Sequence, residues 1–227
     1  MSHLTSVPGE ANAGRRAPGQ VPLRLFILGA TGGTGRALVD QARERGHAVT
    51  AFVRSPQRLG APRAGVIVRQ GDPRSVAELS AALPGHDAVL SALGPPGLGR
   101  TTILRECARS TVAAMQVAGV RRLVVVSAAM LFENAGILFA VLRRILLRNV
   151  AEDSAEMERV VMASGLEWTI ARPPKLTNGP LTENYQVENG RMPHGRISIS
   201  RADVAHFLLG ELESDAHARE IIGMAGT

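Results

Sequence analysis

The segment Leu25–Gly35 constrains the fold more than any other part of the chain, because a short apolar run leads directly into a glycine-rich turn. Leu25–Leu28 has the length and composition of a buried parallel strand. Glycines stand at positions 29, 32, 33 and 35, and Arg36–Glu44 has the pattern of a helix. A strand, a glycine turn and a helix in this order form the context that a dinucleotide-binding fingerprint requires.

The glycines of this turn have separate predicted roles. Gly29 permits the tight turn, Gly32 lets the backbone approach a pyrophosphate, and Gly35 lets the helix pack close to the strand. Gly33 is additional to this spacing and is a further candidate cofactor contact. The free N–H groups and the dipole at the start of the helix then hold the phosphates. The alternative is an α/β domain with a glycine-rich turn and no ligand.

The rest of the chain is long enough to complete one domain. With 227 residues, of which 45% are apolar, it can form a full core. Residues 1–20 are rich in Gly, Ala, Pro and Ser without periodicity and predict a disordered leader, so the folded domain is expected to span 21–227. Cys107 is the only cysteine, which excludes an intrachain disulfide and favours a reducing, cytoplasmic location.

The net charge of +6 comes almost entirely from arginine, since Lys175 is the only lysine among 26 basic residues. A basic chain that binds nucleic acid or a membrane surface carries its charge in clusters. No basic helix face interleaved with aromatic residues is present, and no apolar run reaches the roughly 18 residues that span a membrane. We therefore expect a small-molecule partner rather than nucleic acid or a membrane.

Strand and helix patterns alternate along the chain after the first unit. The further strands are predicted at Ala48–Val53, Gly65–Arg69, Asp87–Leu93, Arg121–Ser127, Leu166–Arg172, Ile197–Ile199 and Glu220–Gly223. The helices between them are predicted at Pro73–Leu83, Thr101–Val117 and Asp153–Ala163, and a last one follows Ser200. This order predicts a single Rossmann-like, doubly wound α/β domain whose mostly parallel sheet has about six to seven strands and helices on both faces.

Two arginines follow the second predicted strand, where a dinucleotide fold places the adenosine ribose. An acidic residue there accepts from the ribose 2′-hydroxyl of NAD, whereas arginine accommodates the 2′-phosphate of NADP. The chain has Arg54 and Arg58 at this point and no acid between them. We therefore predict NADP(H) as the cofactor. The alternative is that both arginines are solvated loop charges.

Other candidate contacts stand at the ends of later strands. Asp72 is placed either to cap the next helix or to lie beside the adenine. Leu93 and Gly94 end the fourth strand, where the backbone can approach the cofactor. Ser127 ends the fifth strand at the edge where open α/β sheets bind ligands, so its hydroxyl is a candidate to orient the nicotinamide or a substrate carbonyl. Its alternative role is a hydrogen bond to its own backbone.

The apolar segment Met130–Val150 follows the fifth strand and carries arginines at helical spacing. It can be a pocket wall or lid, a subunit interface, or ordinary core, and we favour pocket wall plus core. The substrate pocket is expected to form from residues 127–150 and 173–198. Pro173 begins a rigid, extended exit from the sixth strand and is a further candidate cofactor contact.

The number and order of the residue types in the chain argue against several catalytic arrangements. Many short-chain reductases use a tyrosine whose pKa is lowered by a lysine four residues later. The only tyrosine here, Tyr185, follows the only lysine, Lys175, by ten positions, so this pair cannot form. Neither a Ser-His-Asp order with triad context nor a His/Cys cluster for a metal is evident.

The chain resembles the atypical short-chain dehydrogenase/reductases, in particular the biliverdin reductase B (flavin reductase) group and, further off, the NmrA-like proteins. The matching segments are Gly29-Ala-Thr-Gly-Gly-Thr-Gly35, Val53-Arg54 with Arg58-Leu59, Gly71-Asp72, Leu93-Gly94, Ser164-Gly165-Leu166, Arg172-Pro-Pro-Lys-Leu176 and Ile199-Ser-Arg-Ala-Asp-Val-Ala205. The resemblance implies a single, usually monomeric Rossmann domain in which NADPH delivers hydride to flavins or tetrapyrroles. It implies cofactor contacts at Gly29, Thr31, Gly32, Thr34, Gly35, Arg54, Arg58, Asp72, Leu93, Gly94 and Ser127.

Two positions depart from that group. Ala128 stands where the group has a serine, and Glu158 stands where it has a histidine. The polar side chains that the resemblance implies for tetrapyrrole reduction are therefore absent from these positions. Flavin or quinone reduction does not depend on them. The prediction is an NADPH-dependent oxidoreductase acting on a flat conjugated acceptor, as a monomer or weak homo-oligomer. The main alternative is a non-catalytic NADP(H) redox sensor of the NmrA-like type. An epimerase or dehydratase would need a base, and none is placed for it.

Overall fold

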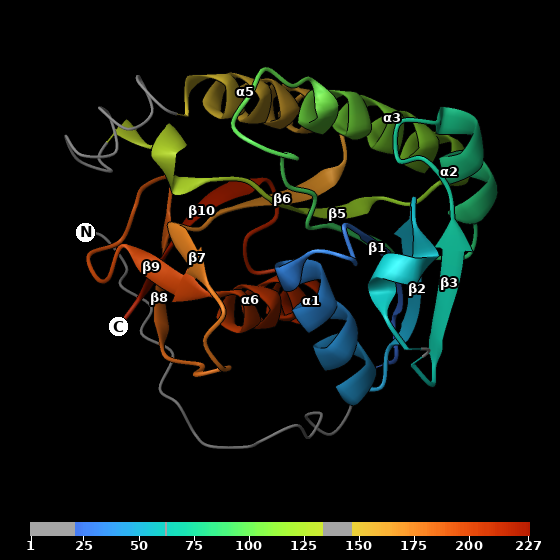
Figure 1. The fold of residues 1–227 in the computed structure, drawn as a ribbon, viewed down its shortest axis with the longest axis horizontal. Coiled ribbons are helices and arrows are strands. Elements are labelled where there is room, and N and C mark those ends of the chain that lie inside the picture. Colours follow the sequence, from blue (N-terminus) through green and yellow to red (C-terminus); the bar gives the residue numbers. More distant parts are fainter. Residues whose placement is uncertain (1–20, 62, 134–146) are drawn as a thin grey trace.

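The computed structural model describes residues 21–61, 63–133 and 147–227, which form a mostly parallel eight-stranded sheet between two helical layers (Figure 1). The strand order is β3-β2-β1-β4-β5-β6-β10-β8, and only β8 runs antiparallel to its neighbour. The bounds are β1 Arg24–Leu28, β2 Ala48–Val53, β3 Val66–Gln70, β4 Ala88–Ser91, β5 Arg122–Val126, β6 Glu167–Arg172, β8 Tyr185–Asn189 and β10 Glu220–Gly226. Two further strands, β7 Lys175–Thr177 and β9 Ser198–Ser200, pair in parallel as a separate ribbon.

The helices lie on both faces of the sheet. Figure 1 shows α1 (Gly33–Glu44) and α6 (Arg201–Ser214) on one side, and α2 (Val76–Ala82), α3 (Ile103–Ala118) and α5 (Arg148–Met162) on the other. Short 3₁₀ turns, η1 (Pro56–Leu59) and η2 (Ala129–Leu131), follow β2 and β5. The predicted Rossmann-like, doubly wound α/β fold is confirmed.

The central strands are apolar on both faces because each face packs against a helical layer. In β1, Leu25 and Ile27 belong to the core beneath α1 and α6, whereas Phe26 and Leu28 belong to the core beneath α2, α3 and α5. All four side chains are buried. This two-sided burial explains why β1 reads as a continuous apolar run rather than as an alternating strand.

The sheet has one strand more than the six to seven predicted. The additional strand, β8, is only five residues long, and within it Tyr185 and Val187, which pack on the core, alternate with Gln186 and Glu188. It forms because its backbone pairs with the apolar strand β10, with Tyr185 opposite Gly226 and Asn189 opposite Ile222. Pairing of this kind depends on the neighbouring strand and leaves little signal in the sequence of the strand itself.

Four predicted helix starts were wrong, and the start of α3 is Ile103 rather than Thr101. The helix α1 begins at Gly33 rather than Arg36, because the last glycines of the turn lie in its first turn. The helix α2 begins at Val76 rather than Pro73, and its cap is Ser75, whose hydroxyl accepts a hydrogen bond from the N–H of Glu78. The prediction that Asp72 caps this helix is therefore wrong.

The helix α5 begins at Arg148, before the predicted start at Asp153. Asp153 lies within this helix, and its side chain faces α3. The carboxylate of Asp153 is buried and accepts hydrogen bonds from the N–H groups of Leu104 and Arg105, at 3.0 and 3.2 Å. It thus caps the N-terminus of α3 from a distant part of the chain. The predicted cap of α6 is confirmed, since Ser200 accepts from the N–H of Asp203 at 2.9 Å.

Two predictions concern residues outside the part of the chain that the structure describes. The leader at 1–20 is one, and most of the apolar segment 130–150 is the other. The substrate-pocket boundaries at 127–150 and 173–198 therefore stay a prediction. Within the described residues, no helix combines the length and the apolar character needed to cross a membrane.

Candidate functional site

The candidate site lies where the strand order reverses. From β1 the chain passes through α1 to β2 on one side, while β4 lies on the other side of β1. In open α/β sheets, ligands bind outside the carboxyl ends of the strands at such a switch point. The glycine turn after β1 and the turn after β4 meet here, because the N–H of Ala92 donates to the carbonyl of Leu28 at 3.0 Å.

Gly29 allows these two turns to approach. Its φ is +78°, and a Cβ atom there would lie 2.5 Å from the carbonyl oxygen of Ala92. Both facts exclude a side chain at this position. A Cβ at Gly35 would overlap the carbonyl oxygen of Gly29, which is how α1 packs so closely on the end of β1. The predicted structural roles of these two glycines agree with this geometry.

Gly32 and the first turn of α1 form the part of the turn that faces solvent. Gly32 is exposed, and a Cβ there would have one neighbour, the Gly29 oxygen at 3.3 Å. The N–H groups of Gly33, Thr34 and Gly35 belong to the first helical turn and have no acceptor within the helix. The half-buried Thr31 lies beside them. Free N–H groups of this kind bind phosphate groups, and the contact of this turn with a pyrophosphate stays a prediction.

Three arginines lie in the segments that directly follow the neighbouring strands β1 and β2. Arg54 and Arg58, at the end of β2 and in η1, are exposed, and neither forms an ion pair with the residues that the structure describes. Arg36, on the exposed face of α1, donates from Nη2 to the carbonyl of Arg58 at 2.7 Å. It too has no carboxylate partner among these residues. Arg36 was not predicted as a site residue, although its place directly after Gly35 was a usable signal.

Asp72 lies near this cluster and is held by a neighbour. Its carboxylate accepts from the backbone N–H of Arg74 at 3.0 Å and from the guanidinium of Arg74 at 2.7 Å. The hydrogen bond from the Arg74 side chain keeps the pKa of Asp72 below its usual value, and the charge of Arg54 acts in the same direction. Asp72 is therefore ionised near neutral pH, and its contact with an adenine stays a prediction.

Ser127 directly follows β5. Its N–H donates to the carbonyl of Ala171 at 2.7 Å, while its Oγ is buried and has no hydrogen-bond partner among the described residues. A buried hydroxyl without a partner is costly and rare unless a ligand completes it. The carbonyl of the buried Pro173 accepts a hydrogen bond from the N–H of Ala129 at 2.9 Å. This bond joins the segment after β6 to the segment after β5.

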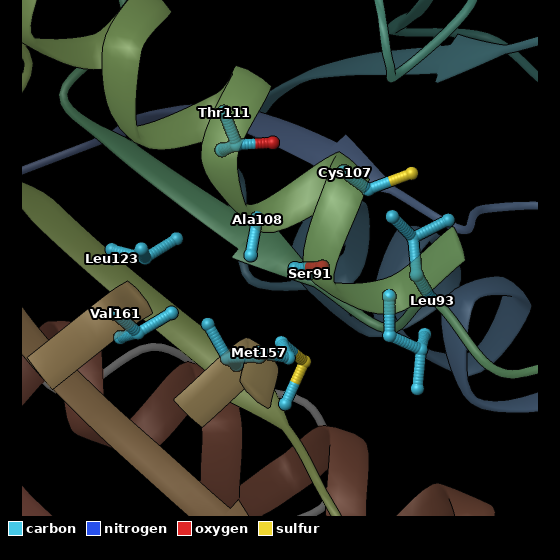
Figure 2. Close-up of a pocket in the computed structure, with 10 residues that line it drawn as sticks. Ser91, Leu93, Cys107, Ala108, Thr111, Leu123, Met157 and Val161 are labelled. Carbon is cyan, nitrogen blue, oxygen red and sulfur yellow. The ribbon is translucent and has the colours of Figure 1, made fainter. Parts of the chain in front are cut away.

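The loop after β4 is open where the prediction placed a contact. Gly94 is exposed, and a Cβ there would have no neighbour within 4 Å, so packing does not require glycine at this position. Leu93 is half-buried and lines the small cavity of Figure 2. Contact of either residue with a cofactor stays a prediction.

The cavity of Figure 2 lies between the sheet and the helices α3 and α5. Cys107 and Thr111 line it from α3, and Met157 and Val161 line it from α5. Its volume of about 10 Å³ leaves space for no more than one water molecule, so it is not a cofactor or acceptor site. Burial raises the pKa of the Cys107 thiol to about 11, which is typical of a packing residue rather than a nucleophile.

A buried ion pair lies beside the segments that follow β5 and β6. Glu158 is 2% exposed, and its carboxylate accepts two hydrogen bonds from the guanidinium of Arg172, of which the Nε bond is 2.9 Å long. The Cζ atom of Arg172 lies 4.5 Å from the centre of the Phe132 ring. Glu158 is the residue that stands where the resembling group has a histidine. It is neutralised by Arg172, so it is not a free acid or base.

The remaining candidate acids are occupied elsewhere. Tyr185 on β8 forms a hydrogen bond of 2.8 Å with Nδ1 of His206 on α6, and burial raises the pKa of its hydroxyl. The exposed Lys175 lies on β7. Within the residues that the structure describes, no group of histidine, cysteine and carboxylate side chains is arranged to hold a metal ion.

The glycine turn at the switch point and the arginines beside it define a Rossmann-type nucleotide-binding protein. A family model described as NAD(P)H-binding matches residues 29–215, and the chain belongs to this family. A Bacillus subtilis protein named as an uncharacterized sugar epimerase, YhfK, is 27% identical over 201 residues, which cover 84% of this chain and 88% of the relative.

Two solved structures share the fold. A short-chain dehydrogenase/reductase from Veillonella parvula, in complex with NADP, has a TM-score of 0.72 and 21% identity, and the match covers 88% of this chain and 93% of that one. A candidate NADH-flavin reductase from Streptococcus pneumoniae has a TM-score of 0.70 and 24% identity, with 90% and 100% covered. The predicted membership of an NAD(P)-binding family is confirmed.

Proposed function

We propose that the protein is an NADPH-dependent reductase that transfers hydride to a flat conjugated acceptor, such as a flavin or a quinone. The observation that carries the choice of NADPH is the cluster of Arg36, Arg54 and Arg58, which have no carboxylate partner among the described residues. Guanidinium groups bind phosphate oxygens through two parallel hydrogen bonds, and the ribose 2′-phosphate distinguishes NADPH from NADH. The NADP complex of the Veillonella relative is consistent with this choice.

The residues of the chain divide the work of the reaction. The first turn of α1 binds the pyrophosphate through its free N–H groups, and the three arginines bind the 2′-phosphate. The unpartnered hydroxyl of Ser127 orients the nicotinamide amide or the carbonyl of the acceptor. When bound, NADPH supplies a hydride. The proton that balances the reduction comes from water, which an exposed flavin or quinone ring can reach, so the protein mainly aligns two rings.

The choice of acceptor rests on what the site lacks. Tyr185 forms a hydrogen bond with His206, and Glu158 accepts hydrogen bonds from Arg172. Neither Tyr185 nor Glu158 therefore serves as a proton donor for a ketone. A flavin or quinone does not need one. The description of the Streptococcus relative as a candidate NADH-flavin reductase points to the same acceptor class. The same lack of an acid also favours the second candidate, a non-catalytic NADP(H) redox sensor, which would bind the cofactor without turnover.

Replacing Arg54 with alanine is expected to raise the dissociation constant for NADPH by about tenfold to a hundredfold, because one charge-assisted contact to the 2′-phosphate is lost. The dissociation constant for NADH should change less than about twofold on the same reasoning. Nicotinamide fluorescence measures both. The matched control is Arg43→Ala, which removes an exposed arginine from the other end of α1. Equal affinities of the Arg54 variant and the wild type for NADPH would refute the 2′-phosphate site.

Replacing Ser127 with alanine tests the site of hydride transfer. We expect kcat with FMN to fall by about threefold to tenfold, the effect of one neutral hydrogen bond. The thermal stability should not fall, since the hydroxyl has no partner to lose among the described residues. If the variant keeps the wild-type kcat, the proposal that Ser127 takes part in hydride transfer is wrong.

A further inference from the structure

Arg201, the first residue of α6, crosses the face of the glycine turn. A Cβ atom built at Gly33 would lie 2.5 Å from Cδ, 2.8 Å from Nε and 3.7 Å from Cζ of Arg201. The side chain of Arg201 therefore occupies the space that any residue other than glycine would need at position 33. This contact gives Gly33, which is additional to the Gly29-x-x-Gly32-x-x-Gly35 spacing, a packing role beside its backbone N–H.

The guanidinium of Arg201 is only partly satisfied. Its Nη1 donates to Oδ1 of Asn178 at 2.6 Å and, more weakly, to the carbonyl of Leu176 at 3.4 Å. Both acceptors are neutral. Within the described part of the chain, Nε and Nη2 have no hydrogen bond and Arg201 forms no ion pair. The half-buried side chain thus brings an uncompensated positive charge to the glycine turn.

The nearest carboxylate in sequence is committed elsewhere. Asp203 is buried, and its Oδ1 accepts from the N–H groups of Thr182 and Glu183 at 2.7 and 2.9 Å. Its Oδ2 accepts from the hydroxyl groups of Thr182 and Ser200. These four bonds fill the acceptor sites of Asp203, so the charge of Arg201 stays available to a ligand.

We propose that Arg201 is a cofactor-binding residue whose guanidinium, packed against the first turn of α1, binds the pyrophosphate beside that turn. The proposal rests on the proposed function, because it needs a dinucleotide in the glycine turn. The free N–H groups of Gly33 and Thr34 and the dipole of α1 favour an anion here. A guanidinium with free Nε–H and Nη2–H donors adds two charge-assisted hydrogen bonds to phosphate oxygens.

A purely structural role makes a different prediction. If Arg201 only linked Asn178 to α1, its loss would weaken every ligand of the site equally or lower only the stability. A pyrophosphate role weakens only those ligands that contain a pyrophosphate. Adenosine 2′-monophosphate carries the adenine, the ribose and the 2′-phosphate of NADP⁺ but no pyrophosphate, so a comparison of these two ligands separates the roles.

The test is isothermal calorimetry of Arg201→Gln with NADP⁺ and with adenosine 2′-monophosphate. We expect the dissociation constant for NADP⁺ to rise by about tenfold to a hundredfold and that for adenosine 2′-monophosphate to change less than about twofold. Arg201→Lys, which keeps the charge but not the planar fork, should lie between. Arg43→Gln controls for the loss of one positive charge, because it is exposed at the far end of α1.

Gly33→Ala gives an independent variant, since the added Cβ displaces Arg201 without removing its charge. It should weaken NADP⁺ binding but add little to the effect of Arg201→Gln, because both changes remove the same contact. Equal losses for the two ligands, or additive effects of the two substitutions, would overturn the proposal. A wild-type protein that binds adenosine 2′-monophosphate but not NADP⁺ would also overturn it, and one that binds neither would refute the proposed function as well.

Discussion

Replacing Gly35 with alanine is expected to abolish NADPH binding and to lower the free energy of unfolding by about 3 kcal/mol, at the upper end of the usual cost of overpacking. The added Cβ would overlap the carbonyl oxygen of Gly29 and press on the backbone of Ala30. Both groups are main-chain atoms at the junction of β1 and α1, so no side-chain rotation relieves the overlap. Urea denaturation measures the stability, and nicotinamide fluorescence measures the binding.

Gly32→Ala is the matched control for this change. Its Cβ would have one neighbour, the Gly29 oxygen at 3.3 Å, and would otherwise project into open space. The protein should therefore keep its wild-type free energy of unfolding within about 0.5 kcal/mol, as exposed substitutions usually do. NADPH binding should be lost, because the added methyl group occupies space that the phosphate needs. Wild-type affinity in either variant would contradict the assignment of this turn to the cofactor.

Replacing Glu158 with alanine is expected to cause the largest loss of stability among these changes, about 3–5 kcal/mol in the free energy of unfolding. The side chain of Arg172 is 13% exposed, and its guanidinium would stay largely buried without the carboxylate that binds it. Such an uncompensated charge costs more than the pair gains, because water cannot reach it. Urea denaturation of the two proteins at the same pH measures the difference.

Two comparisons separate this effect from a general loss of charge on α5. Glu152→Ala removes an exposed partner of Arg148, with side chains 62% and 75% exposed, and should cost less than about 1 kcal/mol. The double variant Glu158→Gln with Arg172→Met removes both buried charges and should recover much of the stability. A loss of less than about 1 kcal/mol in Glu158→Ala would contradict the buried pair that the structure describes.

The first unit of the fold was predictable because its signals are local. A four-residue apolar run, glycines that sterics require, and a following helix all lie within twenty residues. The same holds for the cap at Ser200, where a side chain bonds a backbone group three residues later. Asp72 and Ser75 compete for the same local role, and pattern alone did not separate them.

The tertiary features were not predictable, because their partners are far apart in the chain. Asp153 caps a helix that begins fifty residues earlier, and β8 depends on β10 for its backbone hydrogen bonds. Arg201 is far from Gly33 in the sequence, and the two residues come into contact only in the folded domain. In each case the residue type permits several roles, and only the packing of α1, α3 and α6 selects one.

Steady-state oxidation of NADPH and of NADH, with FMN and with a simple quinone as acceptors, tests the central claim most directly. The loss of the reduced-nicotinamide absorbance reports hydride transfer. We expect turnover that depends on the acceptor and is at least about tenfold faster with limiting NADPH than with limiting NADH, as the loss of one phosphate contact requires. Protein that binds NADPH but transfers no hydride to either acceptor would contradict the reductase and favour the redox sensor.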